Sequence, residues 1–325
     1  MEEKNIELED GAGGKKSSDL INEIRKNFKL KTKWKNMEDD SAVFDLGKEK
    51  LVFTTDAFIV DPIFFPGGDI GKIAMCGTIN DLSVMGAKPI GIALSLVIEE
   101  GFPKKDLEKI LKSIGKISKE TKVPIVTGDT KVTEKGKIDK IEITTSGVGL
   151  VKRVIENSGA KIGDVVIASG NLGDHAVALL SERFNYKTKI KSDCQPIISE
   201  LKGVGKYLTS AKDPTRGGLA TILNEIADKS KVKINLKEDN LPFGKEAVAL
   251  SELLGIDKFS FPSEGRFVAT TSKRNAQKVL SILTKYNKAK IIGEIKKGKG
   301  VYLETNLGGI KKIENPRGKL IPRIC

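Results

Sequence analysis

The sequence predicts an α+β protein of two domains, each a β-sheet backed by helices. Its 325 residues match two domains of ~150 residues each. Helical and strand-like apolar patterns alternate irregularly in both halves, which favours this class over a doubly wound parallel sheet. A polar, glycine-containing stretch at 156–163 separates the halves. We therefore expect domains at 1–155 and 156–315, followed by a tail at 316–325 whose prolines and lack of periodicity predict mobility.

Elements of the first half follow from apolar spacing and from capping residues. Ser17 or Ser18 is a suitable N-cap for a first helix with an apolar stripe that ends at Phe28. The run at 90–98 is continuously apolar without a helical period, which predicts a buried strand. Apolar residues repeat every three or four positions across 104–121, as in an amphipathic helix. The expected helices are 17–28, 70–86 and 104–121, and the expected strands are 43–46, 51–60, 90–98, 123–127 and 138–151.

The second half begins again with a short apolar strand and continues with more helix than the first half. The same criteria define its elements. The expected helices are 175–184, 197–209, 219–229, 245–254 and 274–286. The expected strands are 165–169, one between the helices 219–229 and 245–254, 267–271, 290–295 and 301–304.

Composition excludes several classes of protein. With 39% hydrophobic and 30% charged residues, the chain is neither fibrous nor of low complexity. Its three cysteines are far apart and form no C-x-x-C pair, which argues against structural zinc or a disulfide framework and fits a reducing compartment. The polar, acidic start is unlike a signal peptide, and the longest apolar run is about half of the ~20 residues that a membrane helix needs. We expect a cytoplasmic protein without a membrane partner.

The net charge of +13 is compatible with nucleic acid, with acidic protein partners or with simple solubility. Basic stretches that interleave with aromatic residues would indicate an RNA-binding surface, and the sequence has none. We expect no nucleic-acid partner.

A glycine-rich segment precedes the first helix and contains Gly11, Gly13, Gly14 and Lys15. Glycines let the backbone approach phosphates, and a helix N-terminus offers free N–H groups to them. The segment is not a Walker A loop, because Glu9 stands where that motif needs glycine. It fits a phosphate-binding loop and a flexible loop before a capped helix equally well.

Carboxylates recur at the predicted ends of strands and starts of helices. Some interrupt apolar segments, where an unpaired carboxylate is unfavourable. Carboxylates gathered around Mg²⁺, with phosphate oxygens completing its shell, remove that cost. Singly, each residue is better explained as a cap or a turn; together they favour a magnesium–nucleotide site. The candidates are Asp39, Asp40, Asp56, Asp81, Asp129 and Asp213.

The chain ends in Cys325, a position from which a thiol contributes little to a core but can move with the tail. Arg323 is close enough in sequence to favour the thiolate. Taken alone, this cysteine is better explained as accidental. Of the remaining special residues, the single histidine, His175, is expected to cap a helix start, and Cys76 and Cys194 to pack in the core.

Five segments together resemble one known family. They are Phe53-Thr54-Thr55-Asp56, the run from Phe64 to Lys72, Gly77-Thr78-Ile79-Asn80-Asp81-Leu82, the run from Ile125 to Val132, and Asp213-Pro214-Thr215-Arg216-Gly217-Gly218. The aspartate and glycine motifs alone resemble the wider ATP-binding superfamily of aminoimidazole ribonucleotide synthetase. Gly128-Asp129-Thr130-Lys131 and the ending Pro322-Arg323-Ile324-Cys325 resemble HypE, the carbamoyl dehydratases of [NiFe]-hydrogenase maturation.

The resemblance implies a reaction on the chain's own terminus. A carbamoyltransferase (HypF) attaches a carbamoyl group to Cys325, and the tail then enters the ATP site. ATP phosphorylates the amide oxygen, and loss of phosphate leaves a thiocyanate. The cyano group passes to iron held by a HypC–HypD complex. The implied fold is of the aminoimidazole ribonucleotide synthetase (PurM-like) type, paired as a homodimer through the N-terminal, ATP- and Mg²⁺-binding domains. ATP is bound in a cleft between the N- and C-terminal domains.

The resemblance also implies roles for individual residues. Glu264 is the candidate base, and Lys131 stabilises the charged intermediate or orients the group. Cys325 and Arg323 complete the implied catalytic set. Mg²⁺ is held by Asp40, Asp56, Asp81 and Asp213. ATP is contacted by Gly11, Gly13, Gly14, Lys15, Asp56, Asn80, Asp81, Asp129, Thr130, Thr215 and Arg216.

Two departures and two alternatives remain. Asp10 stands where the family usually has histidine, and Ser263-Glu264-Gly265-Arg266 replaces Asn-Glu-Gly-Lys. Another enzyme of the superfamily, acting on a small molecule, is the first alternative; selenide water dikinases, however, carry a reactive residue in the glycine-rich loop, and residues 10–18 have none. A basic, non-enzymatic interaction protein is the second, and salt-sensitive binding to DNA without ATP turnover would favour it.

Overall fold

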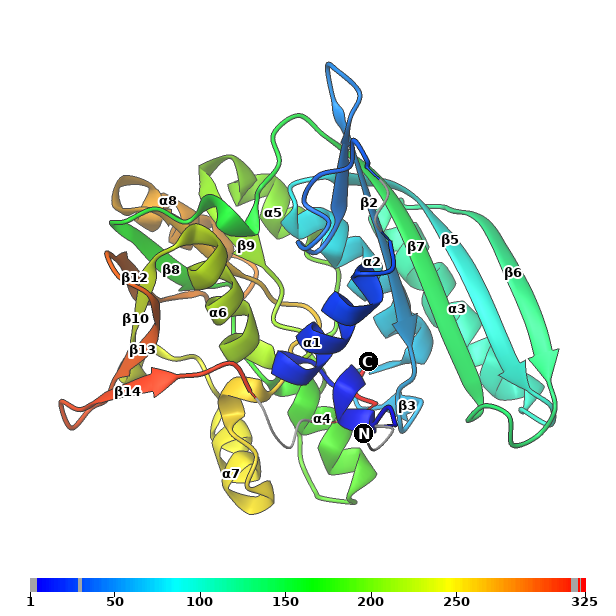
Figure 1. Cartoon of the computed structure of the whole chain (residues 1–325). Helices are drawn as coiled ribbons and strands as arrows, with labels where there is room; N and C mark the ends of the chain where they lie inside the picture. The colour runs from blue at the N-terminus through cyan, green and yellow to red at the C-terminus, as the bar shows by residue number, and fades with distance from the viewer. Residues whose placement is uncertain (1–4, 29–30, 317–320, 322) are drawn as a thin grey trace.

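The computed structural model describes residues 5–28, 31–316, 321 and 323–325. It contains two large β-sheets, with helices lying between them in the view of Figure 1. The first sheet uses strands from residues 42–151 and the second uses strands from 164–313. The mixed α+β architecture predicted from the sequence is confirmed.

The first sheet has the strand order β1-β2-β7-β5-β6. Alternate side chains of β2, such as Val52, Thr54 and Phe58, are buried under the helical layer, and those between them are exposed. Helices α2 and α3 cover this buried face. The bounds are β1 Ala42–Asp45, β2 Lys50–Phe58, α2 Ile70–Val84, β5 Lys88–Glu99, α3 Lys104–Thr121, β6 Ile125–Thr133 and β7 Ile141–Val151, with a small hairpin of β3 Phe64–Phe65 and β4 Gly68–Asp69.

The second sheet has the order β14-β13-β10-β12-β8-β11-β9. The strand β8, which lies between β12 and β11, is buried at every position. The strands are β8 Asp164–Ala168, β9 Leu208–Lys212, β10 Lys233–Lys237, β11 Val268–Ser272, β12 Lys290–Lys296, β13 Gly300–Glu304 and β14 Ile310–Ile313. The helices are α4 Asp174–Arg183, α5 Ile198–Val204, α6 Gly218–Ser230, α7 Lys245–Leu254 and α8 Lys273–Leu283.

The helix predicted at 197–209 is wrong in its second half. α5 ends at Val204, a short 3₁₀ turn follows, and residues from Leu208 form β9. β9 pairs antiparallel with β11, and this long-range pairing overrides the local helical pattern. The strand β14 was not predicted, because its sequence Ile-Lys-Lys-Ile lacks the alternation of a half-buried strand.

Two further expectations in the first half need correction. The first helix, α1, spans Gly14–Arg25 rather than 17–28, and its N-cap is Gly13 instead of a serine. The apolar side chains of Ile21, Ile24 and Phe28 are exposed rather than packed. The run at 90–98 is buried on one face only, because Ile90 is 43% exposed on the outer side of the sheet.

The polar segment at 156–163 packs closely against the second half of the chain. Asn157 and Ala160 are buried, and a Cβ on Gly159 would lie 2.0 Å from the carbonyl oxygen of Thr209. The segment that connects the two sheets is therefore packed against the second half of the chain. In the part of the chain that the structure describes, no helix is both long and apolar enough to cross a membrane.

Two helical glycines give a matched test of the packing between α2 and α3. A Cβ on Gly71 would lie 2.7 Å from the carbonyl oxygen of Ile110, whereas a Cβ on Gly115 has no described atom within 4 Å. We expect Gly71→Ala to destabilise the protein by ~1–3 kcal/mol through overpacking. Gly115→Ala should stabilise it by ~0.5–1 kcal/mol, because alanine is the better helix former. Thermal unfolding of both variants measures this, and equal shifts of the same sign would contradict the assigned packing.

Candidate active site

Carboxylates from three separate segments meet between the two sheets. Asp40 precedes β1, Asp81 lies on α2 and Asp213 follows β9. One oxygen from each lies within 4.8 Å of the other two. Oxygen ligands from several carboxylates at this spacing are what Mg²⁺ requires. We call Asp40, Asp81 and Asp213 the acidic cluster.

Burial makes the ionised acidic cluster unfavourable without a cation. Desolvation and the neighbouring charge of Asp40 raise the pKa of Asp213 to about 8. Desolvation and then the charge of Asp56 raise the pKa of Asp81 well above its usual value. The buried Oδ2 of Asp40 has no hydrogen-bond partner among the described residues. A divalent cation would supply the missing partner and the missing positive charge, so the donor set fits Mg²⁺.

Asp56 faces the acidic cluster from β2. Its Oδ2 accepts a hydrogen bond of 3.0 Å from Thr78 Oγ1 on α2. Thr54, two residues earlier on the same face of the strand, donates from Oγ1 to Asp81 Oδ2 at 2.9 Å. The period of two along β2 therefore aims Thr54 and Asp56 at the same site.

Asn80, which the resemblance predicts to contact ATP, bonds to main-chain groups of the second half through its side-chain amide. Its amide nitrogen donates to the carbonyl oxygens of Gln195 (3.0 Å) and Glu264 (3.1 Å). Its amide oxygen accepts from the N–H of Ile197 at 3.0 Å. Buried and fully bonded to main-chain groups, Asn80 joins α2 to the second half of the chain.

The glycine-rich loop lies against Arg216. A Cβ on Gly13, which has a φ of +97°, would lie 2.8 Å from the carbonyl carbon of Arg216. Gly13 N donates to Ser17 Oγ at 2.7 Å, and Arg216 Nη1 donates to Gly11 O at 3.4 Å. Glycine is therefore required at position 13 by both its φ and its contact. Lys15 is turned away and pairs with Asp19 on the surface of α1.

The C-terminal thiol is seated in this site. Ile321 and Ile324 are buried in the core, and Cys325 packs against the same cluster of apolar side chains. Burial and the charge of Glu264 raise the pKa of the Cys325 thiol to about 12, while Arg216 acts in the opposite direction. The described end of the tail is thus docked; residues 317–320 and 322, which belong to the predicted mobile tail, lie outside the described residues.

Glu264 is buried close to the thiol. Its Oε1 has no hydrogen-bond partner among the described residues. Desolvation, followed by the charges of Cys194 and Asp213, raises the pKa of Glu264 well above its usual value. A carboxyl group with a raised pKa and an unpartnered oxygen is suited to accept a proton.

Arg323, a predicted partner of the thiol, pairs with Asp139 in this structure. Its side chain is partly exposed. Its carbonyl oxygen accepts from Asp61 N at 3.1 Å and from Arg183 Nη2 at 2.8 Å. The positive charge beside Cys325 is that of Arg216, and Cys325 in turn raises the pKa of Arg216 more than any other group does.

Asp129, Thr130 and Lys131 are not brought to the acidic cluster within one chain. They lie on the edge strand β6, which is exposed along most of its length, and Lys131 Nζ is 3.9 Å from Asp129 Oδ2. The register places Asp129 in the row of Ala57, with β5 and β7 between their strands. Three strand spacings separate them, or ~14 Å.

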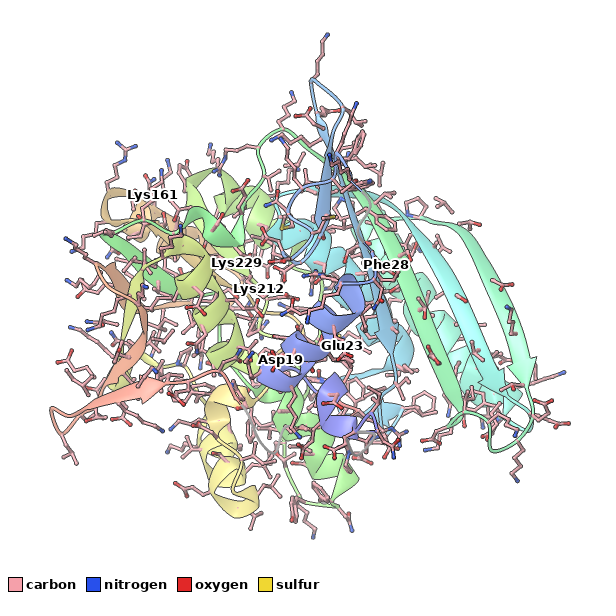
Figure 2. The ribbon with its side chains drawn as sticks, viewed as in Figure 1. Asp19, Glu23, Phe28, Lys161, Lys212 and Lys229 are labelled. Carbon is pink, nitrogen blue, oxygen red and sulfur yellow. The ribbon has the colours of Figure 1, made fainter. Side chains whose placement is uncertain are left out.

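Two lysines that were not predicted as site residues form ion pairs with acidic residues around the site. Lys212 contacts Asp40 and lies 3.2 Å from Glu225, and Lys229 lies 2.8 Å from Asp39. Both lysines are labelled in Figure 2, close to α1 in that view. Lys212 could have been recognised as a site residue from its position directly before Asp213 in the sequence.

His175 was also assigned wrongly. The helix α4 is capped by Gly173, and the imidazole is fully buried instead of capping it. Cys76 and Cys194 are buried as expected.

Comparison with known proteins agrees with this geometry. Residues 38–151 match the family described as AIR synthase related protein, N-terminal domain, and residues 161–306 match its C-terminal domain. The aminoimidazole ribonucleotide synthetase type of fold is thereby confirmed.

Relatives narrow the family further. The carbamoyl dehydratase HypE of Cupriavidus necator is 40% identical over 98% of this chain and 95% of its own length. A solved HypE–HypF complex matches with a TM-score of 0.85 and 39% identity, covering 91% of this chain and 99% of the other. A HypE solved in complex with ATP matches with a TM-score of 0.82 and 34% identity, covering 99% and 100%. The chain therefore belongs to the HypE family of carbamoyl dehydratases.

Proposed function

We propose that this chain is an ATP-dependent carbamoyl dehydratase acting on a carbamoyl group carried by its own Cys325. The product, a thiocyanate, supplies the cyanide ligand of the [NiFe]-hydrogenase iron. The observation that carries this proposal is the seat of the terminal thiol, beside Arg216 and Glu264 and next to the acidic cluster. A small-molecule substrate, the alternative within this fold, gives no reason for a chain to bury its own last residue there.

The reaction removes the elements of water from a primary amide. The amide oxygen attacks the γ-phosphorus of ATP, and ADP leaves. The C–O bond then breaks, so that this oxygen departs with phosphate, and both N–H protons are lost as the C≡N bond forms. An amide oxygen is a poor leaving group, and its phosphorylation removes that barrier.

Two side chains are placed for these demands. Glu264 would take a proton from the nitrogen, since its raised pKa makes its ionised form a stronger base than an ordinary carboxylate. Arg216 would balance negative charge on the phosphorylated intermediate, because it already interacts with Cys325 and Asp56. Thr215 precedes it in the same turn, at the start of α6.

ATP would bind beside the glycine-rich loop, where Gly11, Gly13 and Gly14 lie against the Arg216 segment. The solved HypE with ATP supports a nucleotide in a fold of this kind. Mg²⁺ would be held by the acidic cluster, with Asp56 adjacent, and when bound it neutralises phosphate charge.

Two partners follow from the proposed chemistry. A HypF-type transferase would load the carbamoyl group, and the solved HypE–HypF complex supports this pairing. A HypC–HypD iron complex would accept the cyano group. The same thiol would be loaded by the transferase, would react in its own site and would deliver the cyano group to the iron complex. The tail must therefore also leave the docked position.

A second copy of the chain is the proposed occupant of the β6 edge. This nine-residue strand exposes both faces, including Val126 and Val132, and its outer edge pairs with no described strand. Such an edge is a template for pairing with an identical strand. We propose that residues 1–155 form the homodimer and most of the ATP–Mg²⁺ site, and that 156–315 close over it and add Asp213 and Arg216. Lys131 would act on the site of the second copy.

The proposed substrate is tested on the cysteines. The protein is first carbamoylated with a HypF-type transferase, then separated from nucleotide, and then given ATP and Mg²⁺. We expect the C-terminal peptide to gain one carbamoyl group and to lose one water only in the second stage, as measured by mass spectrometry. Cys325→Ala should abolish both changes, whereas Cys194→Ala should retain them. An unmodified tail with an active transferase would favour the small-molecule alternative.

The proposed cation site is tested by thermal unfolding. Asp213→Asn removes a buried carboxyl group whose ionisation is unfavourable in the folded protein, so it should raise the melting temperature of the cation-free protein. Mg²⁺ should stabilise the wild type and have little effect on this variant. Asp228→Asn, an exposed change on α6, is the control and should respond to Mg²⁺ like the wild type. An equal Mg²⁺ response in Asp213→Asn would remove this residue from the site.

The proposed role of Lys131 across the dimer is tested by mixing inactive variants. Lys131→Ala has a thiol without the lysine, and Cys325→Ala has the lysine without a thiol. Mixed dimers should recover up to about half of the dehydration per dimer, because one of their two sites is complete and holds their single thiol. Absence of recovery in dimers shown to be mixed would place Lys131 outside the partner's chemistry.

A further inference from the structure

One helix binds both carbonyl groups that precede the terminal cysteine. His175, in the first turn of α4, has Nε2 2.8 Å from the carbonyl oxygen of Ile324. Arg183, the last residue of α4, donates from Nη2 to the carbonyl oxygen of Arg323 at 2.8 Å. Main-chain bonds from Ile59 and Asp61 hold the other side of the tail. The docked tail thus lies between the end of β2 and α4.

The surroundings of His175 determine its protonation. A carbonyl oxygen only accepts hydrogen bonds, so Nε2 must carry the proton that points at Ile324. Nδ1 lies 2.8 Å from Ser192 Oγ, which itself accepts from the N–H of Cys194 at 3.1 Å. The serine hydroxyl therefore donates to Nδ1, and burial lowers the pKa of His175, which favours this neutral form. Phe65, in T-shaped contact at 5.3 Å, fixes the ring plane.

The hydrogen bond to Ile324 matters most when the tail is docked. Ile324 is then buried, and without His175 its carbonyl oxygen loses this partner. Leaving this buried acceptor without a partner should lower the equilibrium constant for docking of the tail roughly five- to a hundredfold. In the undocked tail the same carbonyl bonds to water. The contact therefore shifts the balance between the two positions of the tail.

We propose that His175 is a positioning residue that holds the C-terminal tail in the active site through the Nε2–H bond to the carbonyl of Ile324. Its loss shifts the tail towards the undocked position and leaves the acidic cluster and the glycine-rich loop in place. The kinetic consequence rests on the proposed function: dehydration needs a docked thiol, whereas loading by the transferase needs an undocked one.

The first test measures docking without any catalytic step. Cys325 is alkylated with iodoacetamide and followed in the C-terminal peptide released after Glu314, so Cys76 and Cys194 do not interfere. A docked thiol with a raised pKa reacts slowly. We expect His175→Ala to raise the alkylation rate of Cys325 about tenfold. His175→Gln, whose amide nitrogen can donate to the same carbonyl, should stay within about threefold of the wild type.

The second test separates positioning from a general loss of structure. In single turnover, His175→Ala should slow dehydration of pre-carbamoylated protein about tenfold and leave carbamoylation by the transferase unchanged or faster. Alkylation within twofold of the wild type, or equal defects in the alanine and glutamine variants, would overturn the proposal. If the wild type itself fails to dehydrate its carbamoyl group, the proposed function fails, and the alkylation result still decides the role of His175.

A third measurement needs no substitution at His175. The chain has one histidine, so ¹⁵N-histidine labelling of tag-free protein gives the signals of His175 alone. We expect the Nε2–H tautomer, with a proton that exchanges slowly with water. Deleting Ile324 and Cys325 should accelerate that exchange at least tenfold. An Nδ1–H tautomer in the wild type, or exchange unaffected by the deletion, would contradict the assignment.

Discussion

The close approach of Asp40, Asp81 and Asp213 in a buried position is the constraint on which the rest of the structure depends. Their oxygens lie within 4.8 Å of one another, away from most water, where ionised carboxylates repel strongly. The residues come from a loop before the first sheet, a helix over it and a turn of the second sheet. The cluster therefore exists only when both halves of the chain are closed on each other. Lys212 offsets part of its charge, and a bound cation would offset the remainder.

Helix α2 holds this arrangement because successive residues on it serve different elements. Thr78 orients Asp56 on the first sheet, Asn80 bonds to the main chain of the second half, and Asp81 enters the acidic cluster. Gly77 lets the helix come close to the sheet, since a Cβ there would lie 2.9 Å from the ring of Phe58. The Gly77–Asp81 segment is thus one structural unit. It ties the position of the carboxylates to the closure of the molecule.

The docked tail is held mainly through its own backbone. His175, Arg183 and two main-chain N–H groups bind carbonyl oxygens of the last three residues, while Ile324 fills an apolar seat. Each such hydrogen bond contributes only ~0.5–1.5 kcal/mol net, because the free tail bonds to water instead. Several weak contacts suit a segment that must both dock and depart. Burial in the docked position raises the pKa of the Cys325 thiol to about 12, which disfavours the nucleophilic thiolate there.

The sequence by itself determined what depends on neighbours along the chain. The periods of α3 and α7 fixed their bounds, and the alternation in β2 placed Thr54 and Asp56 on one face. The terminal thiol indicated the chemistry only together with the family motifs. Contacts between distant residues were decided by the tertiary structure alone. Pairing of β9 with β11 replaced a predicted helix, the register of the sheet moved Lys131 to an exposed edge, and a buried pocket turned His175 from a cap into a tail contact. Local periodicity reports which face of an element is buried, whereas hydrogen-bond partners and charge neighbours depend on which elements meet.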